Sequence, residues 1–248
     1  MPSMRTRSTP PALLAALLLC GSAQAPANGA LEFQRSVVQV PDALPLNLQG
    51  TWTLEAWIRP GVDDSTRLQT TLGKYAAPDS VAYTLELRGR VLILRVSSGR
   101  RTQSVYSFPS IRPGVWQHVA ATFRERTARL YVNGLVENVV GGIAPPRRSS
   151  GLLRIGNGVT PGTARGFDGA IDEVRIWALA RTTSELNNTM RRRLGGNEPW
   201  LVGYWRFDDG SGDVLHDASR NANHGRLGLA VGPDAADPRW LPEGAPVR

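Results

Sequence analysis

The stretch GFDGAIDEVRIW, residues 166–177, decides the fold of this chain. Its apolar residues Ile171, Val174 and Ile176 are β-branched, and this composition is typical of a β-strand. The Gly-Phe-Asp-Gly that precedes them is typical of a tight turn. The stretch is therefore predicted to be a strand that begins directly after a turn.

A short helix is predicted to follow this strand. Thr182 and Glu185 have the spacing of a capping box, in which each side chain hydrogen-bonds the backbone of the other residue. Leu186, Met190 and Leu194 then recur at the spacing of one helical face. A glycine follows Leu194 and is a natural helix stop. No other segment of the chain has a comparable helix signal.

The rest of the chain consists of short alternating or apolar segments separated by turns. The hairpin signal Asn133-Gly134 predicts a type I′ turn. The predicted strands are residues 31–33, 37–40, 51–60, 70–75, 81–88, 91–96, 102–108, 115–123, 128–132, 135–136, 152–156 and 201–207. The fold class is accordingly all-β: a two-sheet antiparallel jelly-roll sandwich with one short helix after the Gly169–Trp177 strand.

Tryptophans in such a sandwich belong mainly to its interior, because each buries a large apolar area. Core positions are therefore expected for five of them, ahead of a role in stacking on sugar rings: Trp57, Trp116, Trp177, Trp200 and Trp205. Trp57 lies beside Glu55 on the face of its strand opposite the apolar side chains. Either a second layer covers Trp57, or it is exposed to a ligand.

The first 25 residues have the pattern of a secretory signal peptide, with a cut between residues 23 and 30. Arg5 and Arg7 form its positive region, and its apolar run is too short to span a membrane. We therefore expect a secreted, periplasmic or extracellular protein with one domain over residues 30–242 and a tail over 243–248. Cys20 is the only cysteine and lies in the signal, so zinc–thiolate sites and cysteine nucleophiles are excluded from the mature chain.

The formal net charge is +8, and nearly all the cations are arginines. Their positions are spread over many strands, with short runs at residues 100–101, 147–148 and 191–193. Nucleic-acid binding needs a clustered basic footprint, so no nucleic-acid partner is expected. Weak attraction to an acidic polysaccharide is the alternative that this charge leaves open.

Several motifs occur in an order that is familiar from a known family. They are Leu31-Glu32-Phe33, residues 52–60 (WTLEAWIRP), 114–120 (GVWQHVA), 130–134 (LYVNG), 169–177 (GAIDEVRIW) and 201–225. The chain resembles the laminin G-like (concanavalin A-like lectin/glucanase) jelly roll in its bacterial, pentraxin-like variety. Together with the signal peptide and the missing glucanase carboxylates described next, the resemblance favours a secreted, non-catalytic binding or adhesion module for a glycan or an extracellular protein. Many functions occur on this fold, so the resemblance is specific for the fold and not for the ligand.

The glucanases of that superfamily present a Glu-x-Asp-x-x-Glu motif, which puts two carboxylates on one face of a strand. Nothing in this chain matches it. Asp168, Asp172 and Glu173 lack the spacing, and the adjacency of Asp172 and Glu173 predicts that they point to opposite faces. No enzyme is therefore expected. A divergent glycan-cleaving enzyme and a structural envelope component are the two alternatives.

The resemblance to pentraxins also implies a calcium site, formed by an Asp-Asn pair and a carboxylate-rich loop. Asp79 matches the pair, but Ser80 departs from it. The loop that begins at Asn157 has no carboxylate before Asp168. The full site is therefore not expected, and a weaker calcium site that uses Asp79, Asn157 or Asp168 is the remaining prediction.

The histidines form no recognisable catalytic motif with a serine. His118 lies in the Trp-x-His-Val-Ala strand and is predicted to be structural. His216 and His224 lie in turn-rich sequence and are predicted to be turn or cap residues.

Overall fold

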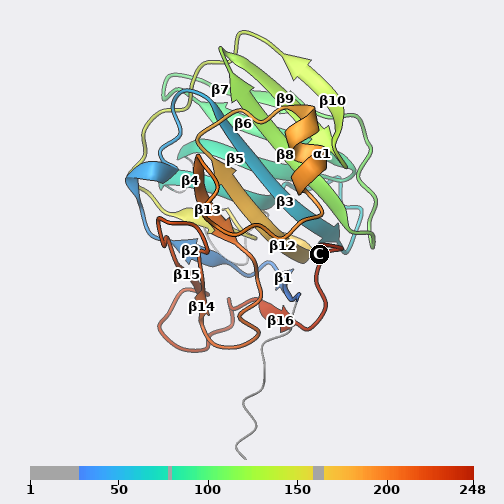
Figure 1. The fold of residues 1–248 in the computed structure, drawn as a ribbon, viewed down its shortest axis with the longest axis vertical. Helices are drawn as coiled ribbons and strands as arrows, with labels where there is room; N and C mark the ends of the chain where they lie inside the picture. The colour runs from blue at the N-terminus through green and yellow to red at the C-terminus, as the bar shows by residue number, and fades with distance from the viewer. Residues whose placement is uncertain (1–27, 78–79, 159–164) are drawn as a thin grey trace, which may run out of the picture.

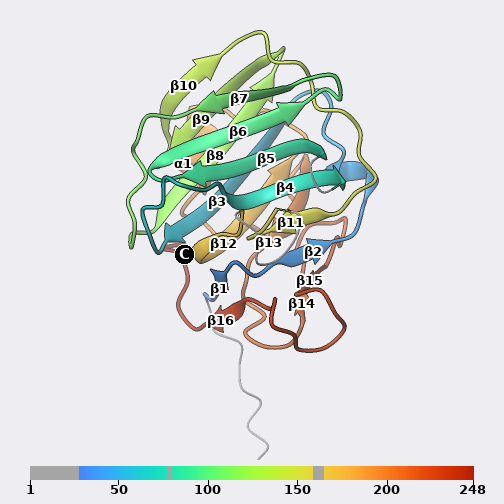
Figure 2. The same cartoon turned by 180° about the vertical axis from the view of Figure 1, so that it is seen from behind.

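The computed structural model describes residues 28–77, 80–158 and 165–248. Two eight-stranded sheets pack face to face, and all named strand pairs are antiparallel (Figures 1 and 2). This confirms the predicted all-β sandwich and its single short α-helix.

The first sheet has the order β10-β9-β8-β3-β12-β1-β16, with β13 also paired to β12. Its strands are β1 Ala30–Gln34, β3 Trp52–Pro60, β8 Gln117–Arg124, β9 Thr127–Val132, β10 Leu135–Val140, β12 Asp168–Trp177, β13 Leu201–Trp205 and β16 Arg239–Leu241. The second sheet has the order β14-β15-β2-β11-β4-β5-β6-β7. Its strands are β2 Val38–Val40, β4 Gln69–Ala77, β5 Ser80–Arg88, β6 Val91–Ser97, β7 Thr102–Tyr106, β11 Leu153–Ile155, β14 Val214–Leu215 and β15 Gly225–Leu227.

Strand β12 is the stretch that the sequence singled out, and it has three partner strands. It pairs with β3 on one side, and on the other with β1 through its first half and with β13 through its second. A β-bulge lies at this change of partner: Asp172 is opposite Trp57, but Arg175 is opposite Glu55. Glu173 takes up the extra residue with a φ of 51°. The bulge lets one strand match two neighbours in succession.

The bulge also overturns one expectation. Ile171 and Val174 both lie in the core between the sheets, so the two residues between them face the same outer side. Asp172 and Glu173 therefore do not point to opposite faces. In a regular strand, adjacent side chains point to opposite faces. The bulge adds one residue to β12, so two consecutive residues, Asp172 and Glu173, lie on the outer side before Val174 returns to the core.

The space between the sheets is filled by a continuous apolar core. Trp52 stacks on Phe123 with ring centroids 5.2 Å apart, and it also contacts Tyr83 of the second sheet at 6.1 Å. Among the five tryptophans expected to be buried, Trp57, Trp177 and Trp205 are buried and Trp116 is half-buried. Trp200 is 64% exposed, so its predicted core position is wrong. It lies in the turn before β13 with a φ of 69°, outside the alternation of the strand.

Helix α1, Thr183–Thr189, lies on the outer face of the first sheet (Figure 1). The predicted capping box is present, with Thr182 and Glu185 hydrogen-bonding each other's backbone. The helix ends earlier than its apolar spacing suggested, because Met190 is its C-cap and Leu194 lies beyond it. A single 3₁₀ turn, η1 Leu44–Leu46, is the other helical element in the described ranges.

The last residues of the chain also pack on this outer face. Ala245 and Val247 form a small cluster with Trp57, and Trp116 packs against it. The indole nitrogen of Trp57 donates a hydrogen bond to the carbonyl of Met190 at 2.7 Å. Trp57 is thus covered by a second layer rather than exposed to a ligand. None of the helices in the described ranges is long and apolar enough to cross a membrane.

Candidate functional site

A buried network of charged side chains lies beneath α1 on the outer face of the first sheet. Glu55 is its centre: the ring of His118 is hydrogen-bonded to one carboxylate oxygen at 3.0 Å, and Trp177 donates to the other at 2.7 Å. Burial by itself raises the pKa of Glu55. The hydrogen bond with His118 and the positive charge of Arg175 outweigh it and lower that pKa to about 2. The expected structural role of His118 agrees with this contact.

Arg175 extends this network from β12 to the helix. Its guanidinium lies 3.9 Å from Glu55 and forms an ion pair with Glu173. It also donates to the carbonyls of Thr189 at 3.1 Å and Arg192 at 2.8 Å, at and beyond the end of α1. Each charge in the network is compensated, and the backbone carbonyls that follow the helix gain strong donors. The network therefore serves to attach α1 to the sheet.

Asp172 and Glu173 also have structural roles. Asp172 accepts hydrogen bonds from the backbone N–H groups of Glu173 at 2.7 Å and Ala245 at 2.8 Å. Burial raises the pKa of Asp172 well above its usual range, and the charge of Glu173 raises it further. Burial also raises the pKa of Glu173, which accepts a hydrogen bond from the Tyr204 hydroxyl at 2.8 Å. The carboxylates of the deciding stretch thus fix the C-terminal segment and β13.

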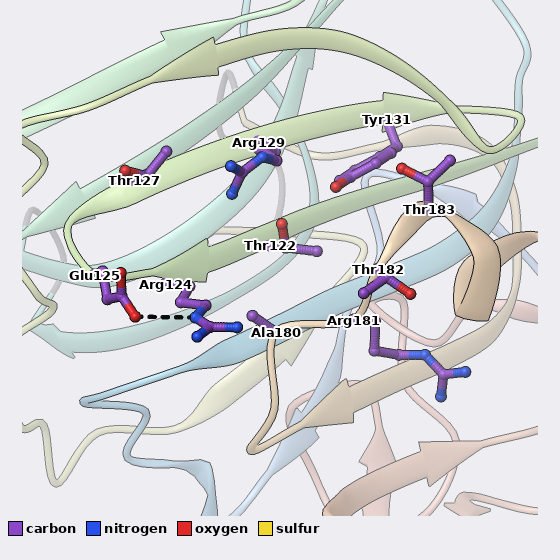
Figure 3. Close-up of a pocket in the computed structure, with 10 residues that line it drawn as sticks. All are labelled: Thr122, Arg124, Glu125, Thr127, Arg129, Tyr131, Ala180, Arg181, Thr182 and Thr183. Atoms are coloured by element: carbon purple, nitrogen blue, oxygen red, sulfur yellow. Dashed lines mark hydrogen bonds and ion pairs between the residues drawn. The ribbon is translucent and has the colours of Figure 1, made fainter.

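A pocket of about 510 Å³ lies beside this network on the same face, between the β8–β9 hairpin and the segment that leads into α1 (Figure 3). It is lined by Thr122, Arg124, Glu125, Thr127, Arg129, Tyr131, Ala180, Arg181, Thr182 and Thr183. Alternation along the two strands places their polar residues on one side, with Thr122 opposite Arg129 and Arg124 opposite Thr127.

The wall of the pocket is held by a threonine in the neighbouring strand β3. The Thr53 hydroxyl donates to the carbonyl of Leu179 at 2.7 Å and accepts from the backbone N–H of Arg181 at 2.9 Å. The Arg181 guanidinium turns toward the helix, donates to the carbonyl of Glu185 at 3.0 Å and lies 4.0 Å from the ring centroid of Trp177. Burial lowers the pKa of Arg181. The wall is therefore a fixed part of the sheet surface.

The floor of the pocket carries polar groups that have no partner. Neither the hydroxyls of Thr122, Thr127 and Tyr131 nor the Arg129 guanidinium takes part in a hydrogen bond or ion pair within the described part of the chain. Thr122 and Tyr131 are each only 2% exposed. None of their polar atoms belongs to the fully enclosed polar atoms of the described residues, so these groups are open to the pocket and can hydrogen-bond a ligand.

Carboxylates are scarce at the pocket. Glu125 is the one acidic residue among those that line it, and its carboxylate lies 3.1 Å from the Arg124 guanidinium. Both side chains of this pair are well exposed, at 64% for Arg124 and 78% for Glu125. The chemistry that the pocket offers is therefore hydrogen bonding and positive charge, without a pair of acids.

The outer face of the second sheet has a polar cluster of its own. Glu86 lies on this outer face because its neighbours Leu85 and Leu87 occupy the core face of β5. Its side chain is nevertheless buried. The carboxylate lies 3.5 Å from Arg95 and 3.9 Å from Arg165. Glu86 is also the single carboxylate in strands β4 to β7. Glycoside hydrolysis ordinarily needs two facing carboxylates, and these four strands supply one that is already compensated.

Two of the three predicted calcium ligands, Asn157 and Asp168, lie in the described residues and have other partners there. Asp79 lies outside the described residues. The buried Asn157 amide donates to the carbonyl of Arg35 at 2.6 Å and accepts from the backbone of Gly158 at 2.7 Å. The Asp168 carboxylate lies 3.8 Å from the Arg67 guanidinium. Residues 28–77, 80–158 and 165–248 contain no group of three or more acidic, histidine or cysteine side chains placed to hold a metal. The calcium site stays a prediction.

The two C-terminal histidines lie in irregular segments next to strands, His216 directly after β14 and His224 directly before β15. The ring of His216 is hydrogen-bonded to Asp209 at 2.6 Å, and that of His224 accepts from the backbone N–H of Asp217 at 3.1 Å. The pocket itself was missed by the sequence analysis. Its signal was the alternation of Thr127, Arg129 and Tyr131 on one face of a strand.

Comparison with known families agrees with the fold. A laminin G family model, described as the concanavalin A-like lectin/glucanases superfamily, matches residues 34–187, which is more than half of the chain. The chain belongs to the concanavalin A-like lectin/glucanases superfamily.

Several solved structures have a similar fold and share low sequence identity with the chain. A putative carbohydrate binding protein from Bacteroides ovatus has a TM-score of 0.65 and 22% identity, over 86% of this chain and 61% of that one. A heptameric SAP-like pentraxin from Limulus polyphemus has a TM-score of 0.54 and 14% identity, over 82% and 95%. The CBM40 of a Ruminococcus gnavus IT-sialidase, bound to alpha2,3 sialyllactose, has a TM-score of 0.52 and 14% identity, over 64% and 95%.

Among curated proteins, pappalysin-1 is similar in sequence to part of this chain. The mouse protein is 27% identical over 164 residues, which are 57% of this chain and 10% of pappalysin-1. The human protein is 28% identical over 102 residues, or 39% of this chain and 6% of that protein. The chain therefore spans a tenth or less of the length of these relatives.

Proposed function

We propose that this chain is a secreted, non-catalytic glycan-binding module and that the pocket between the β8–β9 hairpin and residues 180–183 is its binding site. The observation that carries the proposal is a set of four polar groups at the pocket that have no partner in the described part of the chain, on Thr122, Thr127, Arg129 and Tyr131. The printed descriptions of two structural neighbours, a carbohydrate binding protein and a CBM40 module, support a glycan as the ligand class.

The chemistry of the lining suits a sugar. A sugar hydroxyl donates one hydrogen bond and accepts others, and the hydroxyls of Thr122, Thr127 and Tyr131 can do the same. The volume of about 510 Å³ lies in the usual range of small-ligand pockets. Because Thr53 fixes the wall and the sheet fixes the floor, these groups are held in place before the ligand arrives, which limits the entropy lost on binding.

The absence of a second acid favours binding over cleavage. At the pocket, Glu125 is the one carboxylate and is paired with Arg124; on the outer face of β4–β7, Glu86 is the one carboxylate and lies between two arginines. Neither arrangement provides an acid and a nucleophile that face each other. Calcium assistance through Asp79, Asn157 or Asp168 is kept as a separate arm of the test.

The test is a glycan panel screened with the full chain and with Thr127→Trp. Tryptophan suits a strand and fills the pocket from its floor, so we expect it to abolish the binding of every glycan that the wild-type chain retains. Thr102→Trp on β7, in the other sheet, is the matched control and should bind normally. Repeating the screen with a chelator separates calcium-dependent ligands.

Two outcomes would contradict the proposal. One is that no glycan in the panel binds; the other is that Thr127→Trp and the Thr102→Trp control bind equally well. Release of shorter sugars from a bound glycan would instead favour the alternative of a glycan-cleaving enzyme. Chromatography of the panel after long incubation measures that release.

A further inference from the structure

We propose that the pocket selects an anionic saccharide, with the Arg129 guanidinium as the receptor for a carboxylate or sulfate group. The inference rests on the proposed function, because it names the class of glycan that the same pocket takes.

Arg129 lies at the centre of the floor. In the sheet it is opposite Thr122 of β8 on one side and Val139 of β10 on the other, and along β9 it lies between the outward-facing Thr127 and Tyr131. Its side chain is half-buried and has no hydrogen bond or ion pair with any residue that the structure describes. Its polar neighbours on the floor are hydroxyl groups, which leave its positive charge uncompensated.

Two other arginines of this face, Arg175 and Arg181, have hydrogen-bond partners that Arg129 lacks. Arg175 is ion-paired with Glu173 and donates to two backbone carbonyls. Arg181 donates to the helix and stacks on Trp177. A guanidinium that is partly removed from water and lacks an anion is poised to bind one, and its planar fork matches a carboxylate or sulfate. Arg129 is therefore the member of this group that is available to a ligand.

The net charge of the side chains around the pocket also favours an anionic ligand. Arg124, Arg129 and Arg181 line it against a single acid, Glu125. The Arg124–Glu125 pair is largely exposed, and exposed pairs contribute little free energy, so Arg124 can turn to an incoming anion. The whole chain also carries a formal charge of +8, which attracts polyanions at a distance.

The arrangement suggests how a sugar acid would lie. Its carboxylate or sulfate would contact Arg129, while the ring hydroxyls would reach the Thr122, Thr127 and Tyr131 hydroxyls around it (Figure 3). A neutral sugar would satisfy the hydroxyls but leave the guanidinium without an anion. The pocket should therefore discriminate by charge rather than by ring type.

The test uses matched probes and calorimetric titration of the full chain. Trigalacturonate supplies the carboxylate, its carboxyl-reduced counterpart is the neutral control, and a sulfated neocarratetraose supplies the sulfate. We expect the acidic probes to bind about tenfold or more tightly than the neutral one, and Arg129→Gln to remove about that factor. The advantage should shrink as salt is raised. Comparing the two acidic probes identifies which anion the pocket prefers.

Arg126→Gln is the matched control variant, because it removes the same charge from an exposed position in the same hairpin that does not line the pocket. It should change the affinity for the acidic probes by less than about threefold. Equal binding of acidic and neutral probes, equal effects of the two variants, or no binding of any acidic probe would each overturn the inference. The proposed function fails separately, when Thr127→Trp leaves the binding of every glycan unchanged.

Discussion

The outer face of the first sheet has two halves that contain similar residues in opposite states. In the half covered by α1 and the C-terminal segment, Glu55, Glu173 and Arg175 are buried and each has a charged partner. In the open half, Arg129 and the surrounding hydroxyls have no partner in residues 28–77, 80–158 and 165–248. The two halves belong to one continuous sheet, so the backbone does not account for the difference.

The two halves of this face differ in how their polar side chains are satisfied. Where a second layer covers the sheet, an uncompensated charge would cost several kcal/mol. Glu55 and Glu173 are accordingly paired with Arg175, whereas Asp172 accepts backbone hydrogen bonds and has a raised pKa. Where the sheet forms the floor of a pocket, the same kinds of side chain can stay unpaired because solvent reaches them. Because water can reach these groups, their lack of protein partners costs the fold little, and we infer that they serve a ligand.

The largest expected effect comes from breaking the covered half. Arg175→Met leaves the carboxylates of Glu55 and Glu173 buried without their cation, and we expect a loss of about 3–5 kcal/mol in the free energy of unfolding. Arg129→Met makes the same chemical change in the open half. Its effect should stay within about 0.5 kcal/mol. Urea unfolding of the two variants measures both values, and similar losses would refute the division into two halves.

The next effect is the dependence of stability on pH. The pKa of Glu55 is lowered from 4.5 to about 2 in the folded state, so its contribution is fully present above about pH 4.5 and is lost as the pH falls toward 2. That contribution is on the order of 3 kcal/mol. The raised pKa values of Asp172 and Glu173 act in the opposite direction, since the stability that they contribute at low pH is lost as the pH rises.

Glu55→Gln isolates the first of these contributions. The urea midpoint of the wild-type chain should fall between pH 4.5 and 2 more steeply than that of Glu55→Gln. The difference between the two curves should be flat above pH 5, where Glu55 is ionised in both states. Parallel curves over the acidic range would show that Glu55 has an ordinary pKa in the folded protein.

The smallest effect concerns the cap that connects the two halves. Thr182 lines the pocket and also caps α1, where its hydroxyl accepts from the backbone of Glu185 at 3.2 Å. Thr182→Ala should cost about 1 kcal/mol. Amide hydrogen exchange should become faster in α1 and stay unchanged in β8 and β9. Exchange that accelerates equally in all three elements would mean that the cap supports the whole sheet rather than the wall of the pocket.

The sequence was sufficient for the fold because local and global signals agree. The alternation in residues 51–60 and the Asn133-Gly134 turn specify strands and a hairpin without knowledge of their partners. The capping box likewise marked the start of the helix. The bulge at Glu173 was not predictable, because it arises where β12 changes from one neighbouring strand to another. Trp200 was misplaced because composition alone does not identify a residue at a turn.

The pocket could not be predicted from the sequence for a different reason. Thr122 and Arg129 become neighbours through strand pairing, and the wall at residues 180–183 approaches them only because Thr53 of a third strand holds it. Each residue alone is typical of an exposed strand face. What marks the site is the missing partner of Arg129, and a missing contact is visible only when all the others are known.

The proposed site is tested most directly by mapping a bound acidic oligosaccharide on the isotopically labelled chain through backbone amide chemical shifts. Binding in the pocket predicts the largest shift changes in β8 and β9 around Thr122 and Arg129, and at residues 180–183, with little change in β5 and β6. Changes centred instead on Glu86 and Arg95, on the outer face of the second sheet, would contradict it.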